Sequence, residues 1–189
     1  MLKKLIVMSL ILSGLNGCAI LAIGTVAVVA GVTAAVVTDP RSSGVVLDDN
    51  TIESKLQMKY SKDYPNDNIY VASYNKSILL TGQIANEHTK ESIEFEAKAT
   101  PGVKKIYDYL NVRLPSSFSA RSNDTLITSQ VKTKIIGLDG VSSNDVKIIT
   151  TESVVYLLGV VTKEQATKVA EATAGVSGVT KVVTLFDYK

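Results

Sequence analysis

The feature that most constrains the fold is an internal repeat with a period of about 76 residues. When Asp49 is aligned with Asp124, the apolar positions of the two segments coincide, and they coincide again after a short insertion in the second copy. The chain is therefore predicted to hold two copies of one small module. The matched pairs include Ile52 with Ile127, Leu56 with Val131, Tyr60 with Ile135, Ile69 with Val146, Leu80 with Leu157, and Gly82 with Gly159.

Each copy predicts the order helix, strand, strand, helix, strand. The first helices are expected to open at Asp49 and Asp124, which are good N-cap residues. Alternating apolar residues predict a hairpin, and a helix then connects its second strand to a third, so these two strands can be parallel. The predicted fold class is α+β, with a three-stranded mixed sheet and two helices on one face of it in each copy. The later segments are 69–71, 78–84, 86–100 and 105–112, and 146–148, 154–161, 162–174 and 181–188.

The N-terminus has the pattern of a bacterial export signal. Lys3 and Lys4 precede an apolar run, and Leu15-Asn16-Gly17-Cys18 resembles a lipobox, in which the cysteine is acylated after cleavage. The alternative is that Cys18 is a buried apolar residue of a hydrophobic helix. Ala19 follows where lipoproteins kept at the inner membrane carry Asp, so the resemblance implies an outer-membrane protein facing the periplasm. The expected organisation is a signal peptide (1–17), a lipidated cysteine and tether (18–48), two modules (49–114 and 123–189) and a linker (115–122).

Residues 19–37 carry no charge and leave two interpretations open. As a helix they would be about 29 Å long, close to the thickness of a hydrocarbon core of about 30 Å. They consist mainly of Ala, Val, Gly and Thr, which favours a membrane-proximal tether over a true transmembrane span. The turn-forming residues 39–44 are then expected to be a hinge between the membrane and the folded body.

Charge and composition exclude several classes of function. The chain has 20 basic and 18 acidic residues, and both modules are balanced, so neither has the basic surface of a nucleic-acid binder. One cysteine permits neither a dithiol site nor an internal disulfide, and one histidine gives little support to a metal site. We therefore expect no cofactor, no metal and no enzymatic activity.

The repeated pattern resembles the BON domain family. The resemblance rests on the Asp before each first helix, on Leu80-Thr81-Gly82 and Leu157-Leu158-Gly159, and on Gly102-Val103 and Gly178-Val179 with an aliphatic residue three positions later. Together with the lipobox, two tandem BON domains resemble dual BON-domain outer-membrane lipoproteins. The resemblance implies binding of an anionic phospholipid membrane through the second module, and a role in envelope integrity and cell division.

In those lipoproteins the membrane contact is the first helix of the second module, which here is predicted over 124–136. Ile127, Val131 and Ile135 form the stripe expected to pack on the sheet. Leu126 lies off that stripe and is the candidate for insertion among acyl chains, with Lys132 and Lys134 as candidate phosphate contacts. The alternative is that Leu126 is an ordinary surface residue and that both lysines are merely solvated.

Two other classes of function stay open at this point. The first module holds six of the eight tyrosines, which would be the binding face of an adaptor for outer-membrane assembly proteins. The alternative is core packing with the hydroxyl at the rim, which is the default for Tyr60 because it lies on the apolar register of its helix. An envelope hydrolase is the weaker alternative, because the acidic row Glu87, Glu91 and Glu94 lies on a helix where Glu94 precedes Lys98 by four residues, as in a solvated ion pair. His88, near the start of that helix, is expected to be exposed.

Overall fold

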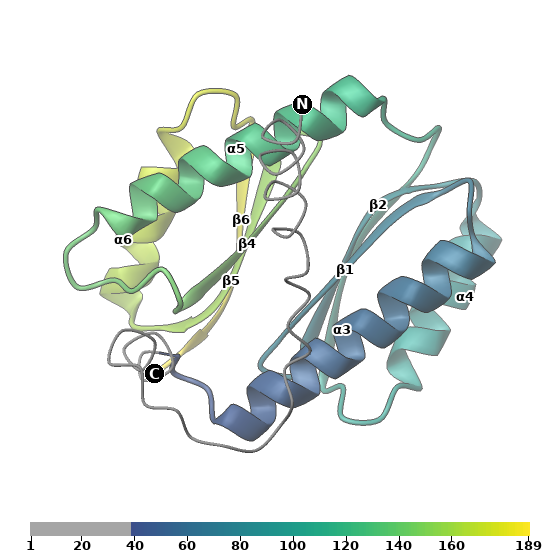
Figure 1. Ribbon diagram of the computed structural model, residues 1–189, viewed down its shortest axis with the longest axis horizontal. Helices are drawn as coiled ribbons and strands as arrows, with labels where there is room; N and C mark the ends of the chain where they lie inside the picture. The colour runs from purple at the N-terminus through teal and green to yellow at the C-terminus, as the bar shows by residue number, and fades with distance from the viewer. Residues whose placement is uncertain (1–38) are drawn as a thin grey trace, which may run out of the picture. The chain divides into compact units, whose positions relative to one another are not determined.

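The computed structural model describes residues 39–189. The predicted signal peptide, Cys18 and the apolar segment 19–37 lie outside the described residues. Within 39–189, none of the helices is both long and apolar enough to cross a bilayer. The predicted order of elements is confirmed in both modules (Figure 1). Module 1 contains α3 (Ser43–Asp63), β1 (Asn68–Tyr74), β2 (Ser77–Ile84), α4 (Glu87–Lys98) and β3 (Lys105–Val112); module 2 contains α5 (Phe118–Ile136), β4 (Val146–Thr151), β5 (Val154–Val161), α6 (Lys163–Ala174) and β6 (Lys181–Tyr188).

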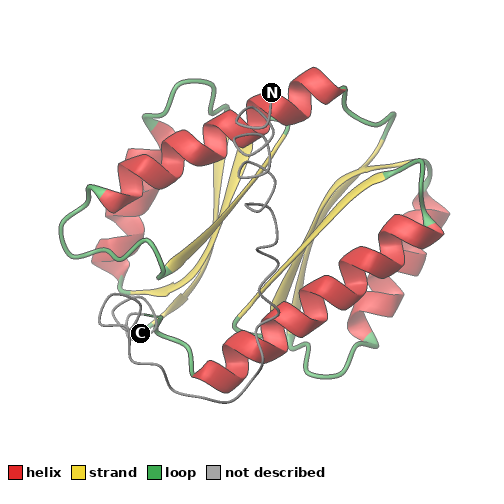
Figure 2. Ribbon diagram, in the orientation of Figure 1, coloured by secondary structure: helices red, strands yellow, loops and turns green. Residues whose placement is uncertain are grey.

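Each module has one three-stranded mixed sheet with two helices on one face, as predicted (Figure 2). The strand orders are β1-β2-β3 and β4-β5-β6, with an antiparallel hairpin followed by a parallel pair. Both hairpins turn on two non-glycine residues with positive φ, Asn75 and Lys76 in module 1 and Glu152 and Ser153 in module 2. Two consecutive residues of this kind are typical of the tight turn that matches the twist of the flanking strands.

Each module has its own hydrophobic core between its sheet and its helices. Ile52, Leu56 and Tyr60 of α3 pack on β1 and β2, and Ile127, Val131 and Ile135 of α5 make the corresponding contacts in module 2. A third cluster covers the other faces of the two sheets, and its members are Ala72, Tyr74, Leu79, Tyr156, Leu158 and Leu185. All three clusters lie within 39–189, and these residues belong to one compact unit.

The first helix of each module begins earlier than predicted. The N-caps are Ser42 and Ser117, whose hydroxyls accept hydrogen bonds from the backbone N–H groups of Val45 and Ala120. A serine that accepts this bond satisfies a helix donor that otherwise has no partner, so the helix can start there. Helix α5 consequently includes Phe118 and the four residues after it, which were expected in the linker.

Asp49 and Asp124 are therefore not N-caps, and that prediction was wrong. Both side chains are buried inside their helices and accept hydrogen bonds from the hairpin turn of the same module. The carboxylate of Asp49 accepts from the backbone N–H groups of Asn75 (2.7 Å) and Lys76 (2.9 Å). The carboxylate of Asp124 accepts from those of Glu152 and Ser153, both at 2.8 Å. Each aspartate therefore ties a helix to a turn whose donors would otherwise be unsatisfied.

The chain before α3 is held on module 1, so the predicted hinge over 39–44 was wrong. The Arg41 guanidinium donates to Asp49 and Asp39, both at 2.8 Å, and lies 3.8 Å from the centre of the Tyr74 ring. Burial disfavours the arginine charge, but the hydrogen bonds to both carboxylates outweigh this effect and raise the pKa of Arg41. The folded body therefore extends back to Asp39.

Candidate functional site

The candidate site is the surface of α5, whose two sides differ sharply. One side is buried and consists of Asp124, Ile127, Val131 and Ile135, which recur at the three- and four-residue spacing of a helix. The opposite side is exposed and carries no charged residue. We call this side the outward face of α5; it consists of Phe118, Ser122, Thr125, Leu126, Ser129, Thr133 and Ile136.

Three large apolar side chains lie on the outward face. Leu126 is 62% exposed, as the sequence predicted for a residue off the buried stripe. Phe118 is 78% exposed and Ile136 is 62% exposed. Phe118 and Ile136 are 18 residues apart, which is five helical turns, so they lie in line along the helix. The outward face therefore presents an apolar residue near each end and a third between them.

The exposed surface of α5 carries positive charge only. Asp124 is the one acidic residue between Phe118 and Ile136, and its side chain is buried. Burial raises the pKa of the Asp124 carboxyl above its ordinary value, against the lowering effect of the Ser153 hydrogen bond. The basic residues of the helix are Arg121, Lys132 and Lys134. This surface is therefore electrostatically suited to an anionic partner.

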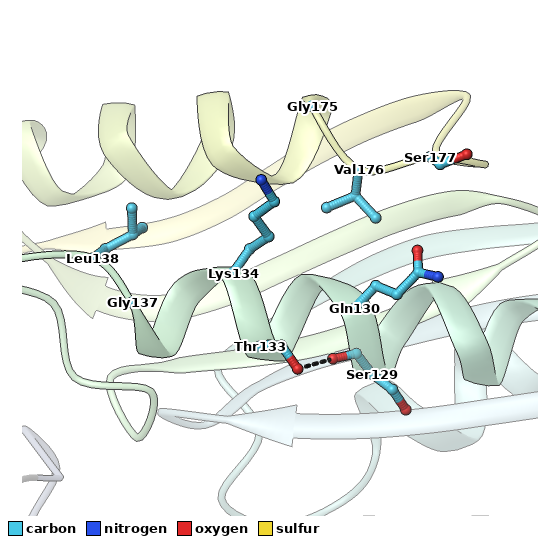
Figure 3. A pocket seen from close by; sticks show the side chains of 9 residues that line it. All are labelled: Ser129, Gln130, Thr133, Lys134, Gly137, Leu138, Gly175, Val176 and Ser177. Carbon is cyan, nitrogen blue, oxygen red and sulfur yellow. Dashed lines mark hydrogen bonds between the residues drawn. The ribbon is translucent and has the colours of Figure 1, made fainter.

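The structure separates the two lysines that the sequence grouped together. Lys132 and Lys134 are both exposed, but they flank the outward face on opposite sides. Lys132 borders a polar hollow of about 360 Å³ that Arg41 and Lys147 also line. Lys134 borders a different recess, between α5 and the end of α6, and its side chain extends from α5 toward α6 (Figure 3). Lys132 and Lys134 therefore border two separate hollows of the surface.

The recess next to Lys134 is a groove of about 710 Å³, lined mainly by small and apolar groups. Gly137 and Gly175 contribute no side chain, and Leu138 and Val176 supply the apolar surface. We call it the α5–α6 groove. Its lining consists of Ser129, Gln130, Thr133, Lys134, Gly137, Leu138, Gly175, Val176 and Ser177 (Figure 3).

Sequence reasoning missed Phe118, Ile136 and the α5–α6 groove. Phe118 was assigned to the linker, although Ser117 before it is a good N-cap and signals the true start of the helix. Ile136 was overlooked because it follows the buried Ile135 directly, yet its position relative to Phe118 places it on the outward face. The groove depends on contacts between two helices far apart in the chain.

The tyrosine-rich face predicted for module 1 is not a free surface. Tyr60 and Tyr74 are buried, and Tyr107 and Tyr109 pack against the cluster shared by the two sheets. The Tyr74 hydroxyl donates to the backbone carbonyl of Asp145 at 3.0 Å, and burial raises the pKa of Tyr74 to about 12. The centres of the Tyr109 and Tyr156 rings are 4.9 Å apart. Tyr60 therefore belongs to the core of module 1, whereas Tyr74, Tyr107 and Tyr109 pack where the two sheets meet. None of these four presents a free binding face.

The acidic row of module 1 has the geometry of a solvated surface. Glu94 and Lys98 form the predicted ion pair at 2.5 Å, and Glu87, His88 and Glu91 are exposed. In the part of the chain covered by the structure, no group of three His, Cys, Asp or Glu side chains is arranged to hold a metal ion. His88 and Glu91 border a hollow of about 320 Å³ on the surface of α4, together with Ser92, Phe95 and Glu96.

Two stretches of the chain, residues 48–113 and 123–189, match the BON domain. With two tandem modules of helix-covered mixed sheet and a match over most of its length, the chain belongs to the BON domain family. This confirms the resemblance inferred from the repeat.

A full-length relative extends the assignment beyond the modules. The chain is 37% identical over 190 residues to outer membrane lipoprotein DolP of Haemophilus influenzae, covering 99% of this chain and 96% of that protein. It is 33% identical to the 21 kDa hemolysin of Actinobacillus pleuropneumoniae (79% of each chain). It is 32% identical to osmotically-inducible protein Y of Escherichia coli (72% of each chain). The similarity to the outer membrane lipoprotein confirms the predicted outer-membrane location.

Proposed function

We propose that this lipoprotein binds anionic phospholipid through α5 of its second module, and that it supports the integrity of the outer membrane without catalysing a reaction. The observation that carries the proposal is the outward face of α5, which exposes Phe118, Leu126 and Ile136 on a helix with no exposed acidic residue. A helix with this combination suits the interface between headgroups and acyl chains, where it lies parallel to the membrane plane.

Two physical terms support membrane binding by this helix. The apolar side chains gain free energy when they leave water, on the order of 1.5–3 kcal/mol for a fully buried leucine or phenylalanine. Each basic residue near an anionic surface adds about 1 kcal/mol, and the exposed Lys132 and Lys134 are available for this contact. Arg121 is half-buried and donates to the backbone carbonyl of Ser116. The second term is screened by salt, so binding is expected to weaken as ionic strength rises.

Vesicle flotation tests the proposal directly. The segment 39–189, which contains both complete cores, should float with vesicles that contain phosphatidylglycerol and should bind phosphatidylcholine vesicles much more weakly. A segment that ignores anionic vesicles would reject the proposal in favour of the protein–protein adaptor, for which outer-membrane assembly proteins are the expected partners.

Replacing Leu126 with aspartate should lower binding to anionic vesicles by about tenfold or more, because it removes an apolar contact and adds a negative charge. Leu114 provides a matched control, since it is 89% exposed and lies outside α5. Leu114→Asp should therefore bind vesicles almost as the parent does. Equal losses in both variants would show that Leu126 is not a specific contact.

The proposed anchor at Cys18 is tested in cells. Cys18→Ser should accumulate as a precursor that retains the signal peptide, because a serine hydroxyl does not replace the thiol that is acylated. Mass spectrometry of the membrane fraction distinguishes this precursor from the processed, acylated chain. Normal processing of Cys18→Ser would contradict the lipobox assignment.

A further inference from the structure

The first module shows how the two helices of a BON domain can be bridged. Lys59 of α3 forms ion pairs with Asp63 on its own helix (2.6 Å) and with Glu96 of α4 (3.3 Å). Tyr64, one residue beyond Asp63, packs against the core with its ring centre 6.2 Å from that of Tyr60. The ends of α3 and α4 are therefore linked by an ion pair, and Tyr64 packs on the core of the module.

Module 2 has a lysine at the position equivalent to Lys59 but no acidic residue at the positions equivalent to Asp63 and Glu96. The repeat aligns Lys59 with Lys134, Asp63 with Leu138, and Glu96 with Ala172. It also replaces Tyr64 with the exposed Asp139. Within the span 39–189, no acidic side chain forms an ion pair with Lys134. The bridge of module 1 is thus replaced in module 2 by the α5–α6 groove.

The chemistry of the groove fits one kind of ligand. Its volume of about 710 Å³ falls within the range of about 300–1,000 Å³ that is typical of small-molecule sites. Leu138 and Val176 give it an apolar wall, and Lys134 is the only basic residue of its lining. Because α5 and α6 both end beside the groove, their last carbonyl groups disfavour an anion there, so an anionic headgroup would depend on Lys134.

We propose that the α5–α6 groove binds one acyl chain of an anionic phospholipid, with the lipid phosphate paired to the Lys134 ammonium group. The inference rests on the proposed function, because the groove is continuous with the outward face of α5. Ser129 and Thr133 belong to both surfaces (Figure 3). A lipid held in this way adds a specific contact to the general attraction between α5 and an anionic bilayer.

Monomeric lipid separates the groove from the membrane surface. Dihexanoyl phosphatidylglycerol, kept below its critical micelle concentration, is titrated into isotopically labelled 39–189 and followed by amide NMR. We expect saturable shifts at Gly137, Gly175, Val176 and Ser177, and at least fivefold weaker binding of dihexanoyl phosphatidylcholine. Absence of saturable shifts at these amides would overturn the proposal, as would shifts confined to Leu126 and its neighbours on the outward face.

The decisive variant rebuilds the bridge of module 1. Ala172→Glu places a carboxylate where Glu96 stands in the repeat, so it should pair with Lys134 and lower the affinity for the monomeric lipid at least tenfold. The glutamine of Ala172→Gln has nearly the same volume as the glutamate of Ala172→Glu but carries no charge. The fold-loss of affinity for the monomeric lipid in Ala172→Gln should therefore be less than half of that in Ala172→Glu. Lys134→Gln should also bind the monomeric lipid about tenfold more weakly than the parent does. Unchanged affinity in Ala172→Glu and Lys134→Gln, with the native amide spectrum elsewhere, would overturn the assignment.

The same variants keep this inference distinct from the proposed function. Ala172→Glu leaves Phe118, Leu126 and Ile136 in place, so it should still float with anionic vesicles. A parent segment that floats but does not bind the monomeric lipid would reject the groove alone. A parent segment that binds the monomeric lipid but does not float would reject the membrane surface and retain the groove. A groove that is instead covered by a second copy of the chain, seen as dimerisation in sedimentation, would overturn the lipid assignment.

Discussion

Replacing Gly82 with alanine should destabilise the protein more than the same replacement at any other glycine within residues 39–189. Gly82 lies in the middle of β2 with a φ of +126°, which side chains of L-residues rarely adopt. An added Cβ would stand 1.8 Å from the backbone oxygen of Asn68, on the paired strand. The backbone of β1 must therefore move, and we expect a loss of folding free energy on the order of 3–5 kcal/mol.

Urea unfolding of 39–189, followed by circular dichroism, measures this loss. Gly44→Ala is the matched control, because a Cβ at Gly44 meets nothing within 4 Å and the residue lies in the first turn of α3. It should leave the stability unchanged or slightly raised, since alanine favours a helix more than glycine does. If Gly82→Ala and Gly44→Ala unfold at the same urea concentration, the close approach of β1 and β2 at this position is wrong.

Removing the carboxylate of Asp49 should cause the second large loss of folding free energy. Asp49 is fully buried and accepts hydrogen bonds from Arg41, from the Ser73 hydroxyl and from two backbone N–H groups of the hairpin turn. Asp49→Ala leaves these donors unsatisfied in the interior and removes one carboxylate partner of the Arg41 charge. Loss of one partner from a buried ion pair costs about 3–5 kcal/mol, and we expect a loss in that range.

The repeat supplies an internal comparison for this experiment. Asp124 occupies the same place in module 2 but accepts from two backbone N–H groups and from no basic side chain. Asp124→Ala should therefore cost less, about 1–3 kcal/mol. Asp48→Ala should be nearly neutral, because the Asp48 side chain is 60% exposed. Equal losses for Asp49→Ala and Asp124→Ala would show that neither Arg41 nor the Ser73 hydroxyl adds to the stability of module 1 through Asp49.

The sequence predicted the repeat, the fold class and the order of elements because these depend on local patterns. Alternating apolar residues specified the strands, and the buried stripe of α5 placed Leu126 on its exposed side. The helix starts were wrong because Asp49 and Asp124 suit an N-cap as well as they suit the hairpin contact that they make. An aspartate takes the second role only if the turn of the hairpin lies beside the helix. This is a tertiary contact that the local sequence does not reveal.

Features that depend on two distant segments were not predicted. The sequence left open whether the tyrosines of module 1 form a binding face or pack in a core, because it does not reveal that the second face of each sheet is covered. The α5–α6 groove was missed although its signal was present. The aligned copies already showed that Leu138 and Ala172 replace the acidic partners of a retained lysine.

If Cys18 is acylated as proposed, the position of Arg41 limits how far the folded modules can move from that anchor. The chain is fixed to the folded body from Arg41 onward and not only from Asp49. Residues 41–48 therefore belong to the rigid body and add no length to the connection between Cys18 and module 1. Extended at about 3.3–3.6 Å per residue, they would span roughly 27 Å. Folded mainly as the start of α3, they span about 12 Å, so the maximum reach is shorter by about 15 Å. For a chain anchored in this way, the radius of the periplasmic volume that the modules sample would be smaller by the same distance, which would raise the local concentration of α5 near its own leaflet.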